Sequence, residues 1–224
     1  QRIVPNPAPS IYAQSSKVGT HPRVPQRIAI ISNHVPPELF DAAEMLGSAD
    51  VHVDIIGEQG VVQEVTPALI AQYDGVITIG KTVQYCMMSS TPVFVYDRFG
   101  GFGYLNDENF DACAYANFSG RGGARKNGEG IAKDVIDDFQ QACSYSDAMH
   151  GVWRETYGME HVLEDLFESV EPRTSITFPY PGYEHTLRMQ MRFAWRYYRS
   201  WDFELWMRAQ KQHLEDELHR VKEV

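Results

Sequence analysis

Cysteine is scarce in this sequence: Cys86, Cys113 and Cys143 are the only three among 224 residues. An odd number at wide spacing provides neither a disulfide framework nor a zinc pattern, and the histidines are too scattered for metal-ligand spacing. No apolar run approaches the roughly 20 residues that span a bilayer, and no signal peptide precedes the first strand. These absences predict a cytoplasmic protein in a reducing compartment, without a bound metal.

Basic residues are outnumbered, with 20 Lys and Arg against 30 Asp and Glu, for a formal net charge of −10. Such a surface repels nucleic-acid phosphates, so we expect no nucleic-acid partner, although a local basic patch can still hold a small phosphate. Hydrophobic residues make up 43% and charged residues 22%, which is typical of a globular protein with one sizeable core.

Several catalytic signatures are also missing. No Gly-x-Ser-x-Gly elbow or Cys–His pairing is present, and residues 32–37 after the first predicted strand lack the glycines of a dinucleotide fingerprint. Gly75-x4-Gly80-Lys81-Thr82 does satisfy the P-loop pattern. Its four intervening residues, Val-Ile-Thr-Ile, are typical of a strand and cannot also wrap a phosphate, which argues against a Walker-type NTPase.

Short apolar runs rich in β-branched residues alternate with helical patterns. This alternation predicts parallel strands joined by right-handed crossovers, hence an α/β fold with a doubly wound, mainly parallel, Rossmann-like sheet. Thr66 and Pro67 are typical of the N-cap and first position of a helix. The strands are expected at residues 27–33, 51–56, 75–79 and 92–96, with helices at 37–46, from 66, at 83–88 and at 130–142.

Three regions are expected along the chain. Residues 1–26 are proline-rich and aperiodic, which predicts an extended interdomain linker or strap. Residues 27–146 form the Rossmann-like domain, and residues 147–224 form a helical extension. A stripe of apolar side chains from Leu187 to Leu205 indicates packing on the core, on a missing domain or on a second subunit as a homodimer. Its tryptophans and arginines also allow weak peripheral membrane association, which we favour less.

The first candidate site residues follow the third and fourth strands. Lys81 and Thr82 open a helix after Gly80, so ammonium, hydroxyl and backbone N–H groups can meet a phosphate there. Gly100 and Gly101 lie in a glycine-rich loop that lets a ligand approach the backbone. The alternatives are a capping threonine beside a solvated lysine, and a tight turn made by the glycines.

Other candidates lie elsewhere in the sequence. Asn33 and His34 end the first strand, where ligands of open α/β sheets usually bind, and His34 can carry a proton or donate a hydrogen bond. Arg121 belongs to a basic, glycine-rich segment that can clamp a diphosphate. The alternatives are a capping role for His34 and simple solvation of the arginine.

The sequence also resembles the carboxyl-terminal, nucleotide-sugar-binding domain of GT-B glycosyltransferases of the group 1, family 4-like type. Val4-Pro5-Asn6-Pro7 resembles the segment that closes the family's amino-terminal domain, and residues 27–33 resemble its first carboxyl-domain strand. Residues 80–93 resemble the family's glycine, helix and Gly-x-Pro-Val block, and Phe99-Gly100-Gly101 resembles the glycine loop that follows. The resemblance covers residues 4–142.

The resemblance implies donor binding by a glycosyltransferase of polysaccharide biosynthesis, with a nucleoside diphosphate sugar as substrate, no further cofactor and the acceptor domain absent. It identifies no catalytic residue. Ile77 and Tyr85 stand where family members with a Glu-x7-Glu motif carry glutamates, and Tyr85 can stack or donate one hydrogen bond to the donor. Asn33-His34 replaces the family's arginine and lysine pair, which leaves Lys81 or Arg121 to bind the diphosphate.

Two other functions remain open from the sequence. One is a non-catalytic interaction module, in which a Rossmann-like core presents carboxyl-terminal helices for self-association. The other is a flavodoxin-like binder of a different nucleotide or cofactor.

Overall fold

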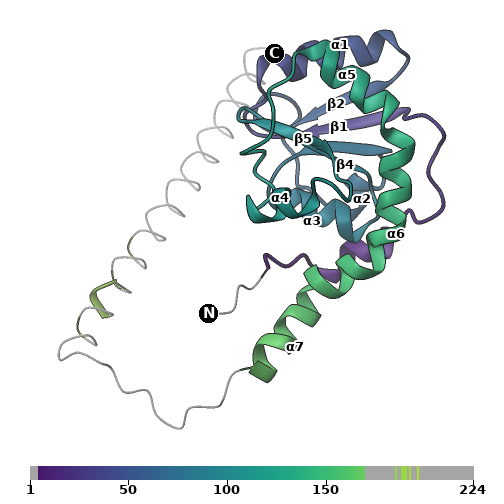
Figure 1. Ribbon diagram of the computed structural model, residues 1–224. Coiled ribbons are helices and arrows are strands. Elements are labelled where there is room, and N and C mark those ends of the chain that lie inside the picture. The colour runs from purple at the N-terminus through teal and green to yellow at the C-terminus, as the bar shows by residue number, and fades with distance from the viewer. Residues whose placement is uncertain (1–4, 170–184, 186–187, 191, 193–195, 197–224) are drawn as a thin grey trace, which may run out of the picture. The chain divides into compact units, whose positions relative to one another are not determined.

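The computed structural model describes residues 5–169, 185, 188–190, 192 and 196 (Figure 1). The chain divides into two compact units, residues 1–170 and 171–224, and the first holds all the elements named below. The apolar stripe from Leu187 onward lies mainly outside the described residues. The elements are η1 (Ser10–Ser15), β1 (Arg27–Ile31), α1 (Pro37–Ser48), β2 (His52–Ile56), α2 (Pro67–Ile70), β3 (Gly75–Thr78), α3 (Lys81–Met88), β4 (Val93–Asp97), β5 (Gly100–Tyr104), α4 (Phe110–Tyr115), α5 (Gly128–Asp137), α6 (Phe139–Tyr157) and α7 (Met159–Ser169).

The sheet confirms the predicted fold class. Its five strands have the order β2-β1-β3-β4-β5, and the first four are parallel. The chain leaves β1 for β2 on one side and returns to β3 on the other, so the strand order reverses between β1 and β3. β3 contains the residues Val-Ile-Thr of the P-loop pattern, which confirms that this motif is mainly a strand rather than a phosphate-wrapping loop.

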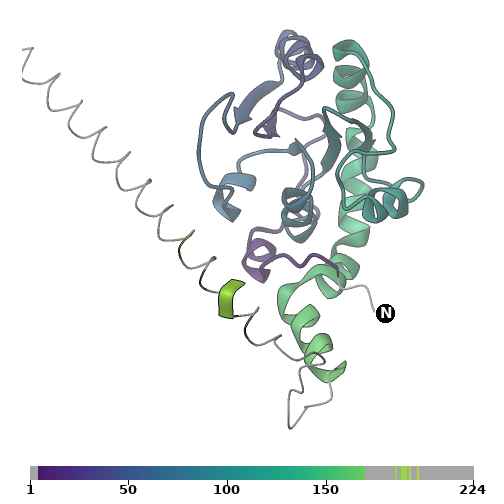
Figure 2. The same cartoon turned by 90° about the vertical axis from the view of Figure 1, so that its left-hand side faces the viewer.

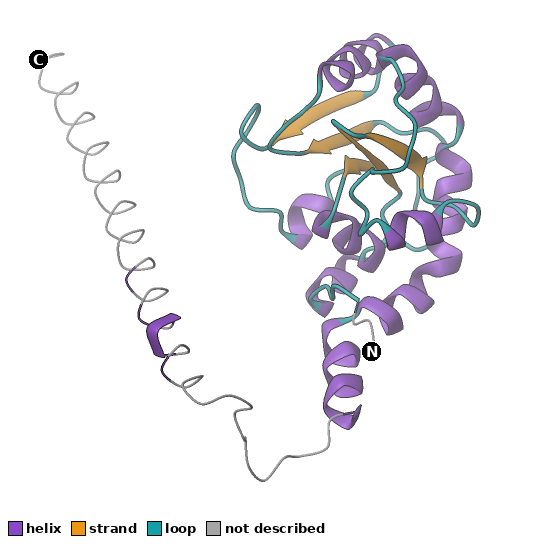
Figure 3. Cartoon of the chain, turned by 60° about the vertical axis from the view of Figure 1, so that its left-hand side comes forward, coloured by secondary structure: helices purple, strands orange, loops and turns teal. Residues whose placement is uncertain are grey.

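Helices cover both faces of the sheet (Figures 1 and 3). One layer contains α1 and α5, whose Leu39 and Ile131 pack with Ile28 of β1. The other contains η1, α2, α3 and α4, and it packs on Ala29 and Ile31 of the same strand. Alternate residues of β1 therefore face opposite layers, and the buried strands β1, β3 and β4 are mainly apolar, as is typical of parallel strands.

Helix α6 joins the two layers. Its first turns supply Phe139 and Cys143 to the layer of α1 and α5, whereas Trp153 and Tyr157 belong to the opposite layer. The helix spans residue 146, at which the Rossmann-like domain is expected to end.

The amino-terminal segment packs against the same unit. Ala8 is fully buried and Tyr12 is 6% exposed. The backbone N–H of Ala8 donates to Tyr157 O (2.7 Å), and the N–H of Met159 donates to Ala8 O (2.9 Å), so this segment lies beside the junction of α6 and α7 (Figure 2). Part of the predicted linker or strap is therefore core.

β5 differs from the glycine-rich loop expected after the fourth strand. Its sequence, Gly-Gly-Phe-Gly-Tyr, pairs antiparallel with β4 through a two-residue turn at Arg98 and Phe99. Low strand propensity concealed it in the sequence. The strand forms because its glycines permit close backbone contacts, described below.

Candidate functional site

A cavity of ≈ 510 Å³ lies at the carboxyl edge of the sheet. It is lined by residues that follow β1, β2, β3 and β4 and by Ser119 and Arg121 of the loop before α5. The hydroxyl of Thr78 donates to Ile31 O (2.8 Å) and so ties the ends of β3 and β1 together beneath it. The cavity therefore occupies the crevice where the strand order reverses, which is where open α/β sheets bind ligands.

Four of the predicted site residues meet in this cavity: Asn33, His34, Thr82 and Arg121. Asn33, His34 and Arg121 are exposed, and Thr82 is half-buried. The N–H of His34 donates to Ser32 Oγ (3.0 Å), which shapes the turn after β1. The structure thus places together an amide, an imidazole, a hydroxyl and a guanidinium, all capable of donating hydrogen bonds to an anion.

Lys81 and Gly80 do not line the cavity. The amine of Lys81 donates to Pro7 O and to Asn6 Oδ1 of the amino-terminal segment, and burial lowers its pKa. Gly80 has φ +62°, and its N–H donates to Phe118 O (2.8 Å). Both groups are therefore engaged by the protein itself.

Tyr85 is likewise engaged away from the cavity. Its ring stacks on that of Tyr12, with centroids 4.1 Å apart and planes 7° apart. The structure thus gives Tyr85 an aromatic partner from the amino-terminal segment.

Gly100 and Gly101 lie under a second backbone segment. The N–H of Gly101 donates to Ala124 O (3.0 Å), and a Cβ on Gly100 would lie 2.8 Å from the same oxygen. Gly123 makes the reciprocal approach, because its Cβ would lie 2.2 Å from Gly101 O. These glycines allow two chain segments to touch, and that contact positions the loop bearing Arg121.

The structure adds Asp97 and Arg98, at the end of β4, to the residues lining the cavity. Arg98 and Arg121 both lie over the ring of Phe99, with guanidinium carbons 4.8 and 4.5 Å from its centroid. Such cation–π contacts hold the two positive charges near one another at the cavity. The signal for them in the sequence is a pair of charged residues directly after the buried run Val-Phe-Val-Tyr.

A neighbouring groove of ≈ 570 Å³ continues from the cavity and shares Asn33, His34 and Arg98 with it. Arg125 lines this groove, and its guanidinium donates to Arg98 O (2.6 Å). Glu38 and Glu58 are the acidic residues on its wall. Three arginines therefore surround the carboxyl edge of the sheet in a protein whose net charge is negative.

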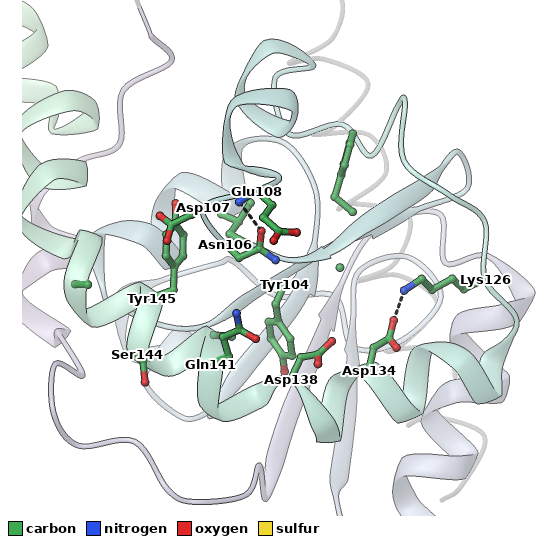
Figure 4. A pocket seen from close by; sticks show the side chains of 15 residues that line it. Tyr104, Asn106, Asp107, Glu108, Lys126, Asp134, Asp138, Gln141, Ser144 and Tyr145 are labelled. Atoms are coloured by element: carbon green, nitrogen blue, oxygen red, sulfur yellow. Dashed lines mark hydrogen bonds and ion pairs between the residues drawn. The ribbon is translucent and has the colours of Figure 1, made fainter.

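A different cavity, of ≈ 610 Å³, lies between β5, α5 and α6 (Figure 4). Its charged lining is largely acidic, from Asp107, Glu108, Asp134 and Asp138, and Lys126 is paired with Asp134. It is not the cavity at the carboxyl edge of the parallel strands, and none of the predicted site residues line it. Its charge disfavours a phosphate ligand.

The fold defines the chain as a Rossmann-like α/β protein with a mixed, mainly parallel sheet. No protein-family model matches the sequence, and no curated protein matches it. Within the described part of the chain, no three His, Cys, Asp or Glu side chains gather closely enough to hold a metal ion. The same residues include no helix with the length and apolarity needed to cross a bilayer.

Proposed function

We propose that this chain binds the donor in a glycosyltransferase, holding a nucleoside diphosphate sugar in the cavity at the carboxyl edge of the sheet. One observation carries the proposal: a cavity at the β1/β3 reversal brings together Asn33, His34, Thr82, Arg98 and Arg121. Ligands of open α/β sheets bind at this position, and cavities of about 300–1,000 Å³ accommodate small molecules.

Each polar group has a role in this proposal. Arg98 and Arg121 bind the diphosphate, because a guanidinium presents paired donors to phosphate oxygens. Asn33, His34 and Thr82 line the same cavity and donate further hydrogen bonds to the ligand. Charge developing on the departing diphosphate would be stabilised by the same cations during transfer.

The remaining predicted residues act behind the cavity. Lys81 and Tyr85 hold the amino-terminal segment, whereas Gly80, Gly100 and Gly101 fix the backbone near Phe118 and Ala124. Transfer also requires an acceptor placed against the donor. We assign only the donor half of the reaction to this chain and name no catalytic residue.

Ligand-induced stabilisation tests the proposal. At a concentration 100 times Kd, a ligand stabilises the fold by about 2.7 kcal/mol, which raises Tm by roughly 5–10 °C for a chain of this size. We expect such a rise with at least one of UDP, dTDP or GDP or their sugar conjugates. Arg121→Ala and Arg98→Ala should each weaken binding about tenfold, since each removes charge-assisted hydrogen bonds.

Arg154→Ala is the matched control, because Arg154 is an exposed arginine on α6 outside the cavity. Its substitution changes the net charge of the protein by the same amount as Arg98→Ala or Arg121→Ala. It should bind like the unsubstituted protein. If none of these nucleotides changes Tm at millimolar concentration, the donor-binding proposal is wrong.

A further inference from the structure

One carboxylate oxygen of Asp97 is buried at the cavity without a hydrogen-bond partner. Asp97 is 6% exposed and lines the cavity, yet its Oδ1 accepts no hydrogen bond within the described structure. Arg98 and Arg121 line the same cavity, but neither guanidinium forms an ion pair with the Asp97 carboxylate in the described structure. Buried carboxylates are normally paired or hydrogen-bonded, so this acceptor requires an explanation.

The position of Asp97 is fixed by the sheet. It is the last residue of β4 and pairs with Gly100 of β5 across the two-residue turn. Val95 and Tyr96, directly before it, are buried in the core. A polar group on a rigid strand end is held in one place before any ligand arrives, which favours binding.

The unpartnered acceptor and the neighbouring cations together restrict the ligand. A carboxylate accepts hydrogen bonds, whereas Arg98 and Arg121 donate them to an anion. A ligand satisfying both must carry a hydrogen-bond donor, such as a hydroxyl, and a negative group. We propose that Asp97 accepts hydrogen bonds from vicinal hydroxyls of a phosphorylated sugar, whose phosphate binds Arg98 and Arg121.

This inference rests on the proposed function, and it assigns recognition of the sugar hydroxyls to the Asp97 carboxylate. The two hydroxyls of a diol match the two oxygens of a carboxylate. A bridging Mg²⁺ is the competing explanation, since Mg²⁺ often binds one carboxylate plus ligand phosphates. We favour the diol because, among the described residues, Asp97 belongs to no group of three or more His, Cys, Asp or Glu side chains that could hold a metal ion.

Asp97→Asn is the decisive variant, because it keeps the shape and replaces one acceptor oxygen by a donor. Calorimetric titration would compare pyrophosphate, UDP, 2′-deoxy-UDP and UDP-glucose, each with Mg²⁺ and with EDTA. We expect Asp97→Asn to weaken at least one hydroxyl-bearing ligand tenfold or more while pyrophosphate binding is unchanged or tighter. Asp107→Asn, an exposed aspartate of the acidic cavity, is the charge-matched control and should change nothing.

The outcomes separate this inference from the proposed function. If the unsubstituted protein binds none of these ligands, the donor-binding function fails and the diol contact fails with it. If binding occurs but Asp97→Asn leaves every affinity unchanged, only the diol contact is overturned. A loss confined to samples with Mg²⁺, and including pyrophosphate, overturns it in favour of a metal.

Stability provides a readout that needs no ligand. Because Asp97 Oδ1 has no partner, Asp97→Asn should leave Tm unchanged or raise it. A large fall in Tm would assign Asp97 a structural role and overturn the inference. If Asp97→Asn does not fold, Asp97→Ser takes its place, since it removes the same charge with a smaller side chain. We expect the same changes in ligand affinity and in Tm for Asp97→Ser.

Discussion

At the scale of single residues, the glycines of β5 differ in what surrounds them. A Cβ on Gly101 would lie 2.0 Å from Val95 O and 2.7 Å from Tyr96 Cα, both backbone atoms of the paired strand. A Cβ on Gly103 would meet only the ring of Phe94, at 3.8 Å, although its φ of +79° disfavours other residues. Gly101 is required because a side chain would collide with the backbone of β4, whereas Gly103 is required because its backbone has a positive φ.

These two glycines give a matched prediction. Gly101→Ala should lower the free energy of unfolding by about 3 kcal/mol or prevent folding, because backbone atoms cannot move aside cheaply. Gly103→Ala should lower it by about 1–2 kcal/mol, the cost of a left-handed conformation. Urea denaturation followed by circular dichroism measures both, and equal losses would contradict the packing argument.

Residue positions also explain which residues of the cavity could be placed there from the sequence. Asn33, His34 and Thr82 could be placed at one edge because the strand ends of a parallel sheet lie together. The partners of Lys81 and Tyr85 could not be predicted, since Pro7 and Tyr12 lie more than 70 residues away in the sequence and no local pattern links them. Nothing in the spacing predicted that contact.

At the scale of elements, the strongly periodic ones were predictable. The four parallel strands and the helices opening at Pro37 and Pro67 lie close to where the pattern places them. The helix predicted at residues 130–142 is instead two helices, α5 and α6, that meet at Asp138. A continuous apolar periodicity hides such a junction, because both helices pack on the same core.

The start of α5 gives a prediction at this scale. Asn127 is the N-cap, and its Oδ1 accepts a hydrogen bond from the N–H of Gly130 (2.9 Å). Asn127→Ala should lower the free energy of unfolding by about 1 kcal/mol, whereas Asn127→Asp, which keeps the acceptor, should be close to neutral. Chemical denaturation would show both, and equal effects would contradict a capping role.

Asp147 joins α6 to the amino-terminal segment and makes stability depend on acidity. Burial alone would raise its pKa, but hydrogen bonds from the Gly19 N–H, the Ser90 hydroxyl and His21 lower it overall. When folding lowers the pKa of a carboxyl group, that group stabilises the folded protein at any pH above its unfolded pKa of about 4. This stabilisation is lost as the pH falls through the pKa of the folded state.

We therefore expect Asp147→Asn to lower Tm at pH 7 and to flatten the loss of stability below pH 4. Asp137→Asn is the control, since its exposed pair with Lys133 should contribute little. Melting curves from pH 7 to pH 3 would measure the difference. Parallel curves for the unsubstituted protein and Asp147→Asn would contradict the argument.

At the scale of the whole molecule, the amino-terminal segment completes the core over α3. Tyr12 stacks on Tyr85, and its hydroxyl donates to Val65 O. Tyr12→Ala should lower the free energy of unfolding by about 3–5 kcal/mol, and Tyr12→Phe by about 1 kcal/mol. A tyrosine in a dispensable linker would show neither loss.

The buried thiols provide the measurement for this prediction. Cys86 and Cys113 are fully buried, and burial raises the pKa of each thiol to about 12, so the folded protein should react slowly with thiol reagents. Tyr12→Ala should accelerate labelling, because opening of the fold becomes more frequent. Unchanged labelling would show that the segment does not support α3.

The anchoring of Ala8 between Tyr157 and Met159 also determines how another domain would be carried. A flexible chain of 26 residues lets its ends separate by roughly 30 Å, and a domain attached to it reorients freely. The segment from Ala8 onward does not have this freedom. Backbone hydrogen bonds hold Ala8, ring stacking holds Tyr12, and a hydrogen bond to Asp147 holds Gly19. A domain attached ahead of this segment would therefore be tethered beside α6 and α7, where Ala8 is held.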